Sequence, residues 1–442
     1  MKKLVTLLAA AGMVVAASAP ANAVDVKVSG FHAFTFETQQ QGFEGQNLEN
    51  AWQRTRLGLN FVASENLSGF LQFQMGTNEW GSYVDAQTEK GNKHGRVDVQ
   101  TRQAYVDWIV PGTSVKVRMG RQQVGLPGEA FGDSSVMSAG WGGRDGIAVS
   151  SPVTDWLALN ALWVRAGVDG NSDLDEGHSS DVFGLAAPMK FNGFAVTPWV
   201  AYGSLDKEAK GDGMNMTLEA DANAYWAGVT ATMSYFDPFT LKASFTYGCA
   251  EYTGAGVDAD DKDGWNAQVK ASYKTAFGTP VLGAWYASGD DELKGDDVKG
   301  QGNMPHIRGR FMPTTTYHNA AWGLGGGIGR EAMGGTWGVF AGIEGVSFIA
   351  DLEHYAGVAY IEGTNDKKNA TKAGFTVSPD YMTTEDSIVE FDFGTTYNIY
   401  KNFVANLELS YIINDFDNRK TEDGKKIDED DWRIGLTFQY NF

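Results

Sequence analysis

The clearest pattern in this chain is a strict alternation of apolar and polar positions over residues 431–442. The residues at the odd positions there are polar or small. Large apolar side chains occupy every even position: Trp432, Ile434, Leu436, Phe438, Tyr440 and Phe442. Because successive side chains of a strand point to opposite faces, the segment is predicted to be a strand with one apolar and one polar face. Aromatics gathered on one face are typical of a transmembrane barrel strand, and an edge strand of a soluble sandwich is the alternative.

The same alternation recurs in pairs of strands joined by short turns. Residues 225–235 and 239–247 alternate on either side of an Asp237-Pro238 turn, and residues 403–413 repeat the pattern. Between such pairs stand long polar connections, many of them rich in Gly and Asp: 38–50, 77–96, 167–180, 205–221, 250–263, 290–335, 363–386 and 415–429. We therefore predict an all-β fold, an antiparallel transmembrane β-barrel of about 18 strands, with about 16 as the alternative. The long connections are read as external loops and the short ones as periplasmic turns.

Hydropathy and the N-terminus agree with export to an outer membrane. The mean hydropathy is −0.29, and no later apolar stretch reaches the roughly 18 residues of a membrane helix. Residues 1–23 have the form of a secretory signal peptide, with a basic start, an apolar run and an Ala-Asn-Ala site ending at Ala23. Residues 24–442 then form one barrel domain. The predicted location is the outer membrane of a Gram-negative bacterium.

Composition argues against several classes of function. The formal net charge of −20 is the wrong sign for a nucleic-acid partner. Cys249 is the only cysteine, so no intrachain disulfide can form. The histidines are scattered without metal-ligand spacing. We therefore expect that the protein is not an enzyme and that it has no catalytic residue, no metal and no cofactor. Residues 169–173 begin like a calcium loop, but Leu174 stands where that loop requires Gly. A solvated loop is favoured there, and loop-bound calcium stays open.

Several basic side chains fall on the polar faces of neighbouring predicted strands. Alternation over residues 53–61 and 115–119, and less cleanly over 101–106, directs five of them toward the lumen: Arg54, Arg56, Arg102, Lys116 and Arg118. Like charges on one wall are unfavourable unless counter-charges or water screen them. The next connection, residues 121–145, is Gly-rich, carries little charge and holds Glu129 and Asp133. It is predicted to fold inward and to form the pore constriction with the basic wall.

Four stretches carry a family resemblance: residues 54–76, 101–122 and 397–418, and the terminal Phe-Gln-Tyr-Asn-Phe. In this order they resemble trimeric Gram-negative outer-membrane porins of the general-diffusion type, including the homotrimeric porins of sulfate-reducing bacteria. The resemblance implies a homotrimer surrounded by outer-membrane lipid and lipopolysaccharide. It also implies that residues 77–96, the second external loop, reach into a neighbouring subunit.

The resemblance extends to single residues. It implies that Arg56 and Arg102 are wall arginines and that Glu129 and Asp133 are the acids of a third loop that faces them. The other wall cations follow from alternation alone. The terminal aromatics resemble the signal read by the barrel-assembly machinery: Phe438, Tyr440 and Phe442. Porins of this type have about 16 strands, fewer than alternation indicates here.

The predicted function is passive diffusion of small hydrophilic solutes and ions through a water-filled channel. A substrate-selective outer-membrane channel is the first alternative, favoured by a count of about 18 strands and by the long connection 290–335. A barrel-based outer-membrane enzyme or adhesin is the second. Conductance in a planar bilayer separates the channels from the last class, and block by a solute separates the two kinds of channel.

Overall fold

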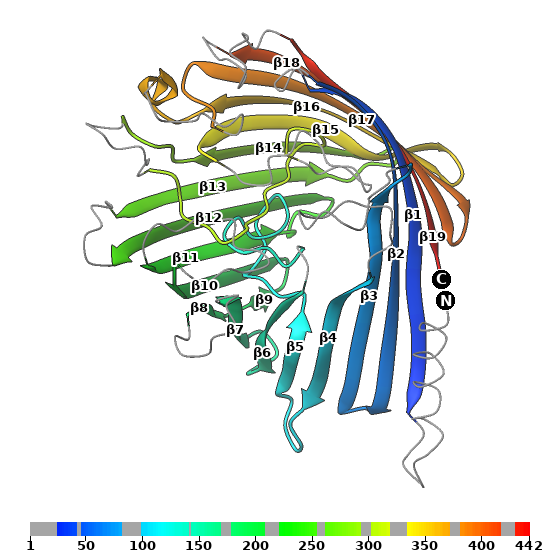
Figure 1. Cartoon of the computed structure of the whole chain (residues 1–442), viewed down its shortest axis with the longest axis vertical. Coiled ribbons are helices and arrows are strands. Elements are labelled where there is room, and N and C mark those ends of the chain that lie inside the picture. Colours follow the sequence, from blue (N-terminus) through cyan, green and yellow to red (C-terminus); the bar gives the residue numbers. More distant parts are fainter. Residues whose placement is uncertain are drawn as a thin grey trace, which may run out of the picture.

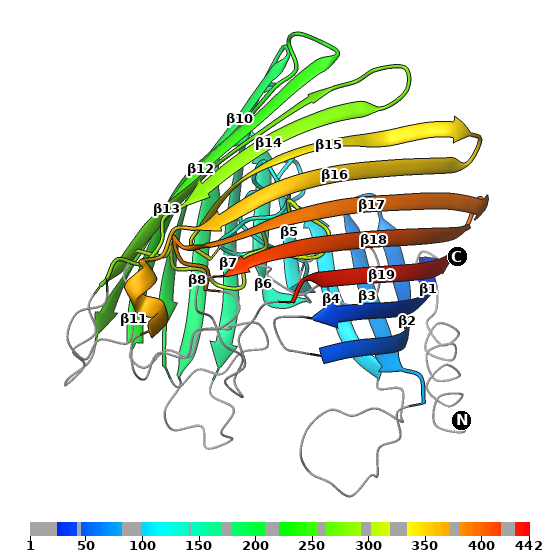
Figure 2. The same ribbon diagram turned by 90° about the horizontal axis from the view of Figure 1, so that it is seen from above.

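The computed structural model describes residues 24–41, 46–81, 99–140, 143–168, 178–207, 221–253, 261–292, 302–318, 334–371, 381–416 and 429–442. Their strands form one closed antiparallel barrel (Figures 1 and 2). In chain order the strands are β1 (Asp25–Gln41), β2 (Gln46–Ser64), β3 (Leu67–Glu79), β4 (Val99–Ile109), β5 (Lys116–Gln122), β6 (Arg144–Pro152), β7 (Ala158–Val168), β8 (Ser179–Ala186), β9 (Met189–Phe191), β10 (Phe194–Leu205), β11 (Asp221–Met233), β12 (Phe239–Thr253), β13 (Lys262–Tyr273), β14 (Thr279–Ala287), β15 (Thr336–Ile349), β16 (Leu352–Gly363), β17 (Asp386–Tyr400), β18 (Phe403–Phe416) and β19 (Asp431–Asn441).

The barrel has eighteen strand positions. Strands β8 and β9 pair with successive parts of β10, so these two short strands together occupy one position in the wall. The nineteen strands of the sheet thus make eighteen positions, which confirms the predicted count. In the described part of the chain the one helix is the 3-10 helix η1 (Lys367–Thr371). No helix there is long and apolar enough to cross a membrane.

The first and last strands close the barrel, as alternation in residues 431–442 predicts. Strand β19 pairs with β18 on one side and with β1 on the other. On the lumen face of the seam, the hydroxyl oxygens of Thr35 and Thr437 lie 2.7 Å apart. The short turns lie at the end of the barrel where the C-terminus lies (Figure 2). The strand ends from which the long connections leave lie at the other end of the barrel, in agreement with external loops and periplasmic turns.

The outer face carries the apolar side chains that alternation assigns to lipid. Aromatics near the short turns are among the most exposed residues: Tyr235, Phe236, Phe277, Phe348 and Tyr400. Such a band is typical of the boundary between membrane and water. The lumen face carries polar residues that are buried within the barrel, among them Asn266, Gln268 and Glu408.

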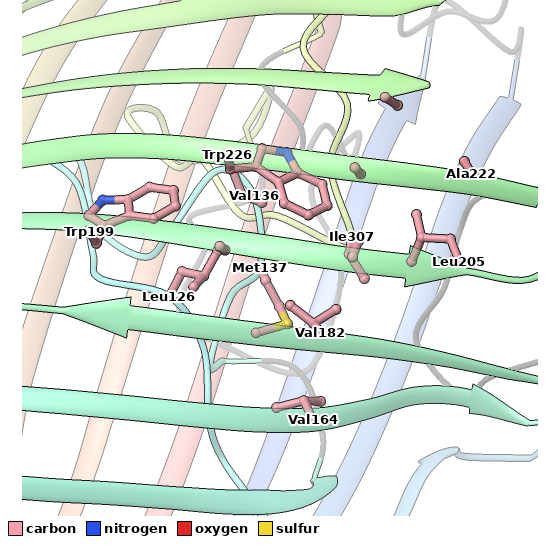
Figure 3. Packing of buried hydrophobic residues seen from close by; sticks show 13 residues of the cluster. Leu126, Val136, Met137, Val164, Val182, Trp199, Leu205, Ala222, Trp226 and Ile307 are labelled. Atoms are coloured by element: carbon pink, nitrogen blue, oxygen red, sulfur yellow. The ribbon is translucent and has the colours of Figure 1, made fainter. Parts of the chain in front are cut away.

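Apolar side chains also face the lumen. They form two clusters in which wall residues pack against residues of the connections. One cluster joins Trp199 and Trp226 of the wall to Leu126, Met137 and Ile307 of two connections (Figure 3). The other joins wall residues of β14 to β18 to connection residues that include Phe131, Phe311 and Tyr317. Burial of this apolar surface inside the lumen stabilises the loops that cover it.

Candidate pore constriction

The connection between β5 and β6 folds into the lumen, as its low charge predicts (Figure 1). Leu126 N donates to Met137 O at 3.0 Å, which closes residues 126–137 into a compact loop. Val136 and Met137 are fully buried at the centre of the apolar cluster. Residues 123–140 are called the first inward segment below.

A second inward segment, residues 302–318, comes from the connection between β14 and β15 and pairs with the first. Ile307 N donates to Val136 O at 2.7 Å, and Arg310 N donates to Ser134 O at 2.9 Å. A Cβ atom on Gly309 would lie 1.6 Å from Ser135 O, so only glycine allows this approach. The expectation that residues 290–335 form an external loop is therefore wrong for 302–318, because the apolar lumen surface attracts this segment inward.

Glu129 fastens the first inward segment to the wall of β12 and β13. Its Oε1 accepts hydrogen bonds from Ser135 Oγ at 2.7 Å and from Thr246 Oγ1 at 3.0 Å. Gln268 Nε2 donates to its Oε2. The residue is only 6% exposed, and burial raises the pKa of its carboxyl group. Strands β12 and β13 lie across the barrel from β2 and β4, which carry the predicted arginine wall (Figure 1).

Arg54, Arg56 and Arg102 lie together on the lumen side of β2 and β4. Arg54 Nε donates to Thr77 Oγ1 at 2.9 Å, and Arg56 Nε donates to Gln74 Oε1 at 2.9 Å. The three guanidinium groups lie near enough for their charges to repel. No carboxylate of the described residues forms an ion pair with any of them. We call these three residues the arginine wall.

A β-bulge brings Arg102 into the arginine wall. In the pairing of β3 with β4, Gln72 faces Gln103 and Phe73 faces Thr101, so Arg102 is the extra residue. Strict alternation places Tyr105 and Asp107 on the face opposite to Arg102, whereas a bulge re-aims the inserted side chain. The side chain of Arg102 reaches the first inward segment, where its Nη2 donates to Gly140 O at 3.4 Å.

Lys116 and Arg118 form a separate group, near the periplasmic turn of β4 and β5. Arg118 holds Asp107 through two hydrogen bonds of 2.7 Å, and Lys116 Nζ lies 3.1 Å from the same carboxylate. The Arg118 guanidinium also lies 4.0 Å from the centre of the Tyr105 ring. The structure therefore separates these two cations from the arginine wall. Both of them pair with the same acid, Asp107.

Asp133 lies beside the contact between the arginine wall and the inward segments. Ser138 Oγ donates to its Oδ2 at 2.6 Å. A Cβ atom on Gly140 would lie 2.7 Å from Asp133 Oδ2 and 2.9 Å from Arg310 Nη1, so both groups approach Gly140. Because Gly140 O also accepts a hydrogen bond from Arg102, these three charged residues converge around one glycine.

Two buried carboxylates of β17 hold the second inward segment. Glu390 Oε1 accepts hydrogen bonds from the backbone nitrogens of Thr316 at 2.6 Å and Tyr317 at 3.2 Å. Asp392 Oδ2 accepts one from Thr315 N at 3.0 Å. These acids satisfy backbone donors that would otherwise be unpaired inside the barrel.

Arginines of the second inward segment are the site residues that sequence reasoning missed. Arg310 approaches Gly140, and the charge of Arg308 acts on Arg144 at the start of β6. A signal for this segment was present in the sequence. Trp199, Trp226 and other apolar residues stand at lumen positions, where a fully water-filled barrel has polar ones.

The terminal aromatics lie on the outer face, as predicted. Tyr440 and Phe442 are exposed, and the Phe438 ring stacks on Phe403 at 6.0 Å. Three regions with predictions lie outside the described residues: the signal peptide 1–23, most of the second external loop at 82–98, and the calcium-like stretch 169–173.

Several solved barrels have a similar fold. OpdK of Pseudomonas aeruginosa with vanillate has a TM-score of 0.57 and 13% identity, over 95% of this chain and 98% of that one. OccK2 (OpdF) of the same organism in complex with glucuronate has a TM-score of 0.56 and 12% identity, over 95% and 98%. OccAB4 of Acinetobacter baumannii has a TM-score of 0.57 and 12% identity, over 96% and 100%.

Sequence comparison assigns the family. No curated protein matches the chain. The family model described as Gram-negative porin matches residues 6–303, more than half of the sequence. This match agrees with the structure, which has an eighteen-position barrel, a polar lumen and two inward segments that narrow the lumen. The chain belongs to the Gram-negative porin family, and it forms an outer-membrane channel for the diffusion of solutes.

Proposed function

We propose that small hydrophilic solutes cross this porin through an opening between the arginine wall and the two inward segments. The observation that carries the proposal is the contact of Arg102 Nη2 with Gly140 O at 3.4 Å. It joins wall and loop at one level of the lumen, where Asp133 and Arg310 also approach. A diffusing solute therefore meets fixed charges on both sides of a narrow aqueous gap.

The predicted site residues take different roles in this proposal. Arg54, Arg56 and Arg102 supply fixed positive charge, and Asp133 approaches the same glycine as Arg102. Glu129 anchors the first inward segment to the side of the barrel away from the arginine wall, because it accepts hydrogen bonds from Thr246 and Gln268. Lys116 and Arg118 act below the opening, toward the periplasm. Fixed charges in a narrow gap orient water and polar solutes, and they disfavour bulky apolar ones.

Planar-bilayer recording tests this function directly. The purified full-length protein should insert in discrete conductance steps. At about 0.1 M salt, where the screening length is about 10 Å, the reversal potential should report a preference for anions. This sign follows from three wall arginines that form no ion pair with a carboxylate of the described residues. A preparation of folded barrel that does not conduct would overturn the proposal.

A second candidate function is selective uptake of small carboxylates. The arginine wall favours it, because guanidinium groups bind carboxylates through paired hydrogen bonds and the described residues supply no carboxylate to these three arginines. Structures with a similar fold hold vanillate and glucuronate, which are carboxylates. Concentration-dependent block of the current by vanillate or glucuronate, without block by vanillyl alcohol or glucose, would favour this function over general diffusion. Equal effects of acid and neutral analogue would exclude it.

The assembly expected from the resemblance is a homotrimer, placed in lipid and lipopolysaccharide by the barrel-assembly machinery. Outward-facing Tyr440 and Phe442 support recognition of the last strand. The second external loop carries the trimer proposal. A trimer in mild detergent, measured by light scattering and weakened when residues 82–96 are removed, would support it. A monomeric wild-type protein would refute it.

A further inference from the structure

A cavity of about 420 Å³ lies in the lumen, separate from the proposed opening. Residues 313–315 of the second inward segment form one side of it. Strands β15, β16, β17 and β18 form the other side. Glu344, Glu353 and Asn406 of its lining lie close to the periplasmic turns of these strands, so the cavity faces the periplasm.

The lining carries more negative than positive charge. Its four carboxylates are Glu344, Glu353, Asp392 and Glu408. Two have a cation: Lys270 Nζ lies 3.2 Å from Glu344, and Arg433 Nη1 lies 3.2 Å from Glu408. Among the described residues, no cation forms an ion pair with Glu353 or Asp392. The cavity thus presents a net excess of negative charge.

Asn406 adds an acceptor that lacks a donor. The residue is only 4% exposed and belongs to the lining. Its Nδ2 donates to Thr396 Oγ1 at 2.9 Å, whereas its Oδ1 accepts no hydrogen bond from any residue that the structure describes. A buried acceptor without a donor destabilises the folded protein. A ligand that donates a hydrogen bond would remove this cost.

The remaining lining sets the shape of the ligand. Pro313, Phe340 and Ile343 give the cavity an apolar part beside the acids. In the described part of the chain, no three acidic, histidine or cysteine side chains gather closely enough to hold a metal ion. The cavity is therefore poorly suited to a metal ion and well suited to an organic cation with an apolar body.

We propose that this cavity binds a small organic ammonium ion with a short apolar body. The ammonium group has three hydrogen-bond donors. It would approach Glu353 and donate to Asn406 Oδ1, while the apolar body packs on Phe340, whose ring also attracts a nearby cation. The site lies beyond the opening and uses none of the residues of the arginine wall.

Channel block tests this site with phenethylammonium chloride as the probe. Millimolar phenethylammonium should reduce the single-channel current, more strongly from the periplasmic side than from the external side. Its neutral analogue 2-phenylethanol should have no effect at the same concentration. Glu353→Gln should weaken the block about three- to fivefold, as expected for a partly solvated ion pair. Asn406→Leu should weaken it as well, through loss of the acceptor.

A matched variant separates this site from general charge effects. Glu292→Gln removes the same charge from an exposed external residue that pairs with Lys368, so its block should equal that of the wild type. Unchanged block in Glu353→Gln, or equal block by 2-phenylethanol, would overturn the proposal. Glu353 is exposed, so this variant folds even if Asn406→Leu does not. Reversal potentials recorded without the amine report on the opening alone, so the two proposals fail independently.

Discussion

Gly30 and Phe442 hold the seam of the barrel through a pair of backbone hydrogen bonds. Gly30 N donates to Phe442 O at 2.8 Å, and Phe442 N donates to Gly30 O at 3.0 Å. The Phe442 ring covers the glycine, since a Cβ atom there would lie 2.6 Å from the ring and 2.2 Å from Arg56 O. The last aromatic and a glycine of the first strand are therefore matched in shape.

Substitution of this glycine should weaken the closed barrel. Gly30→Ala forces a methyl group against the Arg56 backbone and the Phe442 ring, which we expect to cost about 1–3 kcal/mol. The heat-modifiable band on a denaturing gel should be reduced, and the midpoint of urea unfolding in micelles should fall. Deletion of Phe442 should lower the amount of folded barrel in the outer membrane as well, because it opens the sheet edge.

Gly69 in β3 provides a matched control. A Cβ atom there has Tyr105 O at 3.8 Å as its nearest neighbour, which is an ordinary contact. Gly69→Ala should therefore leave the unfolding midpoint close to that of the wild type. Equal midpoints for Gly30→Ala and Gly69→Ala would contradict the role given to the Gly30–Phe442 contact.

The anchor at Glu129 should make the first inward segment sensitive to pH. Burial raises the pKa of Glu129 above its ordinary value of 4.5, so the packed segment favours the neutral carboxyl group. The stabilisation is then fully present below pH 4.5 and is lost as the pH rises through the raised pKa. Open-channel current noise should increase with pH over this window, and Glu129→Gln should abolish the dependence.

Asp133→Asn serves as the control for this pH effect. It changes a carboxylate of the same segment that bonds to Ser138 and lies outside the Glu129 anchor. The noise should keep its dependence on pH in this variant. Noise that falls as the pH rises, or an unchanged slope in Glu129→Gln, would show that Glu129 does not control the segment.

The second inward segment should depend on Glu390. Glu390→Ala leaves the backbone nitrogens of Thr316 and Tyr317 without their acceptor, at a cost of about 1–3 kcal/mol for each buried donor. Loss of this contact should release residues 302–318 from the wall and raise the single-channel conductance. Glu65→Ala removes an exposed acid in the turn between β2 and β3 and should leave the conductance near the wild-type level. A Glu390→Ala channel with wild-type conductance would contradict this role.

Alternation predicted the barrel well because it is a local property of the chain. A strand such as 431–442 must face lipid on one side and water on the other, and this requirement is written in consecutive residues. The strand count, the seam and the lumen side of Arg54 and Arg56 all follow from it. The inward fold of the first segment was foreseen from its low charge.

The contacts that shape the opening could not be predicted in the same way. Glu129 meets Thr246 and Gln268, which lie more than a hundred residues away, so no local pattern connects them. Arg102 faces the lumen as expected, but it does so through a bulge that breaks the alternation of β4, and the sequence pattern does not show this bulge. Residues 302–318 lie within one long connection whose remainder is polar, and their inward path depends on apolar wall residues of distant strands.

The arginine wall should set the ion selectivity of the channel. Arg56→Ser combined with Arg102→Ser removes two of the three positive charges of the arginine wall, so the reversal potential should shift toward cations and larger solutes should pass. Asp133→Asn should shift selectivity toward anions.

Arg118→Gln removes one charge from the Asp107 group, outside the opening, and should have a smaller effect than Arg56→Ser alone. All shifts should shrink toward 1 M salt, where the screening length is about 3 Å. Equal shifts for Arg118→Gln and Arg56→Ser at low salt would place the selective region near β5, and unchanged potentials in the arginine double mutant would place it away from this wall.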